Sequence, residues 1–137
     1  MPKRFTIDIA PFDRTIDVLL DPTKTGARNF VHSELGWSLK DATSWSEHVS
    51  RPNIRGNFLE NQKSIRFVLT IKTKGYSNAY NSGIITHEAF HATVAIFASL
   101  DCRLNKGTEE LFAYMQQYIV RSVWQKAFPD WCKKCHE

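Results

Sequence analysis

The hydrophobic pattern of this chain changes its period once, close to residue 84, and this change constrains the fold more than any other feature. Before it, apolar and polar residues alternate over residues 4–10 and 64–73, which is the two-residue period of a β-strand with one buried face. A further strand-like stretch covers residues 15–20. After the change, a period of 3.6 over residues 84–100 and 109–128 predicts two helices. Strands followed by helices predict an α+β protein.

Length and composition predict a single globular domain. The chain has 137 residues, of which 42% are hydrophobic and 12% aromatic, and this excludes disordered, collagen-like and coiled-coil proteins. We divide the domain 1–137 into a strand- and loop-rich half at 1–75, a helical half at 82–128 and a tail at 129–137. The polar residues 78–83 are predicted to form a loop between the two halves.

Residues 21–57 carry the weakest structural signal in the chain. They are rich in Gly, Pro, Asn, Ser and Thr, and a short helix at 27–35 or at 41–49 is compatible with the pattern. Arg51 and Arg55 lie near Pro and Gly residues in this segment. They are either solvated surface residues, which is the usual state of arginine, or an anion site on a long loop.

Charge, hydropathy and cysteine content predict the environment of the protein. The net charge of +4, from 18 Lys and Arg against 14 Asp and Glu, is mild and evenly spread, so nucleic acid is not the expected main partner. No apolar run approaches the roughly 20 residues of a membrane helix, and no signal peptide is visible. We therefore expect a cytoplasmic protein without a membrane partner. Three cysteines, an odd number, do not indicate a disulfide framework.

The helix predicted over residues 84–100 contains the sequence His87-Glu88-Ala89-Phe90-His91. Two histidines four residues apart project from one helix face, close enough to hold one metal ion through their imidazole nitrogens. Glu88 lies at the edge of that face, where its carboxylate can act as general base on a metal-bound water. Zn²⁺ is the expected metal, since it lowers the pKa of such a water to about 7 and polarises a carbonyl.

A catalytic zinc ion usually has three protein ligands, and Glu110 is the candidate for the third. It begins the helix predicted over residues 109–128 and follows His91 after the 18 residues 92–109. Ala113, three residues later, is small enough to let the two helices approach closely. Glu109 is the alternative ligand, although an acidic first turn also stabilises a helix through its dipole.

The combination of His-Glu-x-x-His, this gap and Glu-x-x-Ala resembles the gluzincin metallopeptidases, which include thermolysin and the zinc aminopeptidases. The wider stretch also resembles small metallopeptidase-like proteins encoded by bacteriophages. The resemblance implies a minimal zincin-like fold, in which a small mixed β-sheet packs on two metal-binding helices. It implies that His87, His91 and Glu110 bind zinc, and that Glu88 is the base in hydrolysis of a peptide or protein substrate. It further implies that the edge of a strand, here the strand at 65–73, binds the extended substrate. For a phage protein, the expected location is the host cytoplasm.

The chain departs from the family pattern in three respects. Tyr114 stands where the thermolysin type has an Asp, the motif by which aminopeptidases grip an amino terminus is absent, and most of the C-terminal subdomain is missing. Residues 21–57 or a partner protein must therefore complete the cleft wall. The residue that stabilises the transition state is Tyr114 or one of four alternatives, which are Tyr118, His32, His48 and His136.

Two other interpretations stay open at this point. The chain can be a non-catalytic phage interaction or inhibitor protein whose metal site serves folding only. Cys132, Cys135 and His136 are either an exposed tail or a second zinc site that Cys102 would complete. The intact Glu88 favours catalysis, because a purely structural metal site needs no base.

Overall fold

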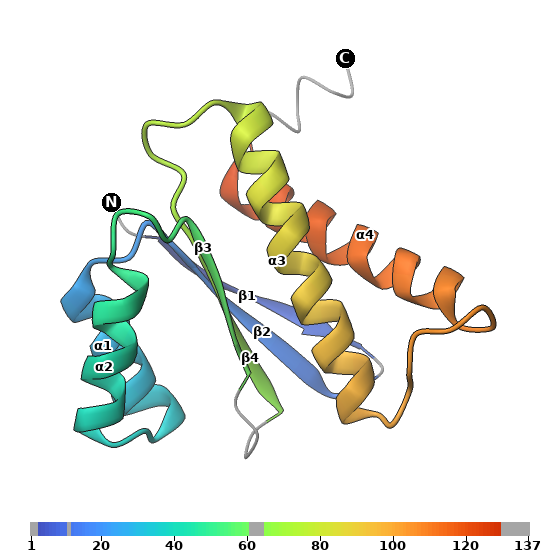
Figure 1. Ribbon diagram of the computed structural model, residues 1–137, viewed down its shortest axis with the longest axis horizontal. Coiled ribbons are helices and arrows are strands. Elements are labelled where there is room, and N and C mark those ends of the chain that lie inside the picture. The colour runs from blue at the N-terminus through green and yellow to red at the C-terminus, as the bar shows by residue number, and fades with distance from the viewer. Residues whose placement is uncertain (1–2, 11, 61–64, 130–137) are drawn as a thin grey trace.

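A four-stranded mixed β-sheet forms the centre of the fold (Figure 1). The computed structural model describes residues 3–10, 12–60 and 65–129. The strands are β1 (Lys3–Ile9), β2 (Arg14–Leu20), β3 (Gly56–Glu60) and β4 (Arg66–Ile71). They follow the order β1-β2-β4-β3, in which β2 and β4 are parallel and the other two pairs are antiparallel. The edges of the sheet are therefore β1 and β3.

Helices cover both faces of this sheet. They are α1 (Lys24–Leu35), α2 (Leu39–Val49), α3 (Asn78–Ser99) and α4 (Glu109–Ala127). Figure 1 shows α1 and α2 on one side of the sheet and α3 and α4 on the other. The larger buried cluster joins the sheet to α3 and α4, and the smaller one joins it to α1 and α2. The predicted α+β class is confirmed.

The three predicted strands form β1, β2 and β4, but β4 is buried on both faces. Phe67, Leu69 and Ile71 belong to the cluster under α3 and α4, as the alternation predicts. Val68 is also fully buried, in the cluster under α1 and α2. A central strand in a three-layer fold has both faces covered, so alternation understates how much of it is buried.

Residues 21–57 contain more regular structure than the sequence indicates. Both of the alternative helices form, as α1 and α2, and each begins at a capping side chain. The Thr23 hydroxyl accepts from the Gly26 amide at 3.0 Å, and the Ser38 hydroxyl accepts from the Asp41 amide at 3.1 Å. β3 was not predicted, because a five-residue strand beginning Gly-Asn has too few apolar residues to show a period.

The loop predicted at residues 78–83 is wrong, since these residues are the first turns of α3. The Ser77 hydroxyl accepts from the Tyr80 amide at 3.2 Å and so begins the helix six residues before the apolar period does. Asn81 is buried, and its amide donates to the Thr73 carbonyl at 3.3 Å. A polar residue at this position therefore connects α3 to the end of β4 rather than marking a loop.

Within the described residues, none of the helices has the length and apolar character needed to cross a membrane. Cys102 is a partly buried free thiol. Its proposed partners in a second zinc site, which are Cys132, Cys135 and His136, lie outside the described residues.

Candidate metal and active site

His87 and His91 lie side by side on the exposed face of α3. Their Nε2 atoms are 3.2 Å apart, and their ring centroids are 4.8 Å apart. Two zinc–nitrogen bonds of about 2.0–2.1 Å at the tetrahedral angle would place their nitrogens about 3.3 Å apart. The observed separation is close to the one that two ligands of one zinc ion have. A hydrogen bond between two neutral imidazoles is the alternative explanation of this distance.

Glu88 turns away from solvent, toward the sheet, and only 7% of it is exposed. A Cβ atom on Gly56 of β3 would lie 2.7 Å from Glu88 Cγ and 2.8 Å from Glu88 Oε1. The carboxylate therefore lies against the backbone of β3, in space that only glycine leaves open. Burial raises the pKa of Glu88 above its usual value, while the charges of His87 and His91 act in the opposite direction. A partly desolvated carboxylate is a stronger base than one in water.

The edge strand beside α3 is β3, and the prediction that the strand at 65–73 offers this edge is wrong. β4 has β2 on one side and β3 on the other, so its backbone groups are already paired. Immediately before β3, the Arg55 carbonyl accepts from the Lys72 amide at 2.8 Å. Along an antiparallel strand, the N–H and C=O groups of successive residues point alternately toward the partner strand and away from it. The backbone groups of Gly56 and Phe58 therefore point away from β4, to the free edge. A chain bound along this edge passes Glu88 at Gly56.

Replacing Gly56 with alanine tests this close packing. We expect Gly56→Ala to destabilise the fold by about 1–3 kcal/mol, because the new Cβ displaces Glu88 and Ile84. Gly83→Ala is the matched control, since a Cβ there has open space inside α3, and it should stabilise the protein by about 0.5–1 kcal/mol. Chemical denaturation measures both changes. Equal effects of the two substitutions would contradict the placement of Glu88.

The first turn of α4 does not bring Glu110 to the two histidines. The rings of Phe97 and Phe112 lie between the helices at this point, with centroids 4.5 Å apart. In Figure 1, the first turn of α4 is at the end of that helix that diverges from α3. Phe112 thus faces α3. Residues two apart on a helix are rotated by about 200°, so Glu110 points away from α3. Within the described residues, no group of three His, Cys, Asp or Glu side chains is arranged to hold a metal ion.

The alternative ligand, Glu109, lies on the face of α4 that is turned toward α3. The Gln116 amide donates to the Thr86 carbonyl at 3.2 Å, which marks this face. Glu109, Ala113 and Gln116 share it, because they are spaced by four and three residues. Helix geometry therefore favours Glu109, whereas the family spacing favours Glu110. Both glutamates are exposed at the start of α4.

The structure separates most candidates for a transition-state donor from the histidine pair. The Tyr118 hydroxyl donates to the Asp8 carbonyl of β1 at 2.9 Å. His32 and His48 belong to α1 and α2, on the opposite side of the sheet from α3 (Figure 1). Tyr114 is 62% exposed on α4. His136 lies outside the described residues. Tyr114 thus stays a prediction, without a contact to the histidines that supports it.

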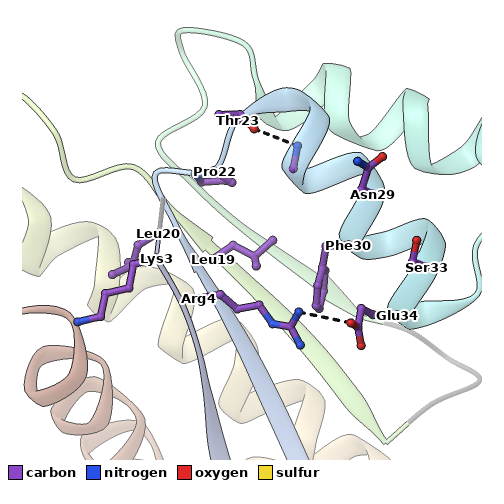
Figure 2. A pocket seen from close by; sticks show the side chains of 11 residues that line it. Lys3, Arg4, Leu19, Leu20, Pro22, Thr23, Asn29, Phe30, Ser33 and Glu34 are labelled. Atoms are coloured by element: carbon purple, nitrogen blue, oxygen red, sulfur yellow. Dashed lines mark hydrogen bonds and ion pairs between the residues drawn. The ribbon is translucent and has the colours of Figure 1, made fainter. Parts of the chain in front are cut away.

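Residues 21–57 do not build a cleft wall through their helices, because α1 and α2 lie behind the sheet. Together with β1 and β2, α1 instead lines a separate open pocket of about 420 Å³ (Figure 2). Leu19 and Phe30 form its apolar wall, and the Arg4 guanidinium lies 4.6 Å from the centroid of the Phe30 ring. Arg4 also pairs with Glu34 at 3.6 Å, and Lys3 is a second cation that lines this pocket.

Comparison of the chain with known protein families, with curated proteins and with solved structures finds no match. The case for a function therefore rests on the arrangement of His87, Glu88 and His91 beside β3. The spacing of these three residues in the sequence predicts their role. Gly56 could not be predicted, because a single glycine between Arg55 and Asn57 carries no signal that a buried carboxylate packs on it.

Proposed function

We propose that this protein is a zinc-dependent hydrolase of peptide bonds. The observation that carries the proposal is the position of Glu88, which is buried against the free edge of the sheet while its two neighbouring histidines converge to 3.2 Å. A base, a pair of metal ligands and an unpaired strand edge thus meet at one place. Surface histidines on an ordinary amphipathic helix do not require a buried carboxylate beside them.

Each of these groups has a part in hydrolysis. His87 and His91 would hold the zinc ion, which when bound polarises the substrate carbonyl and acidifies water. Glu88 would take a proton from the attacking water and then pass it to the leaving amine. The backbone groups of Gly56 and Phe58 would pair with the substrate and hold it extended, as an added strand does on any free sheet edge. The third ligand would come from the first turn of α4, which would have to approach the histidine pair, because no third ligand is in place among the described residues.

The third ligand can be identified by measuring the zinc content of two matched variants. We expect about one zinc per chain in the wild type and a clear loss in Glu109→Ala, because Glu109 lies on the face of α4 toward α3. Glu110→Ala should then keep its zinc. Loss of zinc in Glu110→Ala alone would favour the ligand set of the gluzincins and require α4 to rotate. A wild type that binds no zinc would refute the proposed function.

A second candidate function is supported by the surface around the histidine pair. Phe90 and Val94 of α3 are 43% and 38% exposed, and they lie beside His87 and His91 on the helix surface. Exposed apolar side chains next to an incomplete ligand set suit a protein partner that covers them and completes the metal coordination. In that case the metal site would serve binding, and Glu88 would not be needed as a base.

A further inference from the structure

Arg55 and Lys72 form a cationic pair at the end of β3 and β4. They face each other across the two strands, where the Lys72 amide donates to the Arg55 carbonyl at 2.8 Å. Both residues are partly buried. Gly56, the next residue along β3, is the one that contacts Glu88. The pair therefore adjoins the candidate active site, at the end of the free edge where a bound substrate chain would enter or exit the site.

Neither cation is neutralised by the described part of the chain. The ion pairs found there are Arg4–Glu34, Lys24–Glu47, Arg66–Asp17 and Arg66–Glu34. Among the described residues, the Lys72 ammonium donates to the Arg51 carbonyl, at 2.9 Å. Burial, and then the charge of Arg55, lower the pKa of Lys72, so the two cations repel each other. A bound anion would relieve this repulsion.

An aromatic stack holds Arg55 in position and connects it to α3. The guanidinium lies 4.2 Å from the centroid of the Tyr76 ring, and Tyr76 stacks on Tyr80 with centroids 4.8 Å apart. Tyr80 and His87 are seven residues apart, which puts them on the same face of α3, two turns or about 10 Å apart.

From this arrangement we infer that Arg55 and Lys72 bind a carboxylate of the substrate, beside the point where Gly56 contacts Glu88. The substrate class is thus an acidic peptide, whose carboxylate belongs either to an Asp or Glu side chain or to the chain terminus. Guanidinium and ammonium groups held together on a rigid strand end are suited to such a group. The inference rests on the proposed function for the path of the substrate. Its test, however, requires only binding.

The test uses short fluorescent peptides of alanine and serine in which one glutamate occupies each position in turn, with matched glutamine peptides. Binding is measured by fluorescence anisotropy in EDTA, so that no hydrolysis is needed. We expect one glutamate position to improve affinity about tenfold or more over glutamine. Arg55→Gln and Lys72→Gln should abolish this preference, while Arg55→Lys should keep part of it. Lys74→Gln, an exposed lysine on the adjacent loop, is the matched control and should change nothing.

Amidated and free C-termini separate the two sources of the carboxylate. A preference that appears only with a free terminus assigns the site to the terminal carboxylate, and one that persists in amidated peptides assigns it to a side chain. The inference is overturned if wild-type protein binds glutamate and glutamine peptides equally. It is also overturned if an oligonucleotide binds more tightly than every peptide and loses its affinity in the same variants. Binding without hydrolysis in zinc would refute the proposed function alone.

Discussion

Glu88→Gln is expected to lower kcat for peptide hydrolysis by about 10²- to 10⁴-fold while one zinc per chain remains bound. The amide has the size of the carboxylate and keeps the contact with Gly56, but it cannot accept the proton of the attacking water. Because Glu88 is not a metal ligand in this proposal, zinc content should not change. Hydrolysis of a fluorogenic peptide and elemental analysis of the same sample measure the two quantities together.

The control for this substitution is Glu60→Gln, at the exposed far end of β3. It changes the net charge by the same amount and should leave kcat unaltered. The zinc-free Glu88→Gln protein should be at least as stable as the wild type at neutral pH. Burial raises the pKa of Glu88, so the folded wild type loses stability relative to the variant as pH rises above the usual value of about 4.5. Below that pH the two stabilities should converge.

An unchanged kcat in the zinc-loaded Glu88→Gln protein would contradict the role of Glu88 as base. If the wild type also binds zinc but cleaves no peptide, the candidate function with a metal-dependent partner is favoured. That function predicts that Phe90→Ser, which removes an exposed ring, weakens partner binding while zinc stays bound. The two candidate functions therefore differ in which residue, Glu88 or Phe90, determines the biological effect.

The helical pair His87 and His91 could be predicted because their geometry depends on one helix alone. Residues four apart on any α-helix lie one above the other, so a local pattern is enough to place both imidazoles. The same holds for β1, whose alternation is a local property of that strand. Helix α3 itself was predicted from its apolar period, although its true start depends on the Ser77 cap.

The surroundings of Glu88 could not be predicted, because they depend on contacts between distant segments. Which strand lies beside α3 is decided by the order β1-β2-β4-β3, and no local pattern encodes that order. The clearest strand signal belongs to β4, which is strongly apolar because it is central, and a central strand has no free edge. The signal of β3 is weak because only Phe58 and Leu59 of its five residues are apolar.

The third ligand shows the limit of spacing within a family pattern. The 18 residues between His91 and Glu110 allow α4 to fold back along α3, but they do not fix how α4 is rotated about its axis. Phe112 fixes that rotation by packing on Phe97. A rotation of about 100° per residue then places Glu109 toward α3 and Glu110 away from it. Sequence spacing alone is too coarse to distinguish these neighbours.

His91→Ala is expected to abolish zinc binding and, with it, all peptide hydrolysis. Loss of a group that only supports a zinc ligand costs about 10- to 100-fold in metal affinity, so loss of a ligand itself should cost more than about 100-fold. His87→Ala should have the same effect, because the two Nε2 atoms at 3.2 Å act as one chelating pair. Zinc titration by calorimetry, with EDTA-treated protein, measures the affinities directly.

His48→Ala is the matched control, because His48 is also an exposed helical histidine but lies on α2, behind the sheet. It should bind zinc as the wild type does. Both His91→Ala and His48→Ala should keep the stability of the zinc-free wild type, since each removes an exposed side chain. If His91→Ala retains zinc at wild-type affinity, the 3.2 Å contact is only a hydrogen bond between imidazoles. The metal site, and the hydrolase built on it, would then be rejected together.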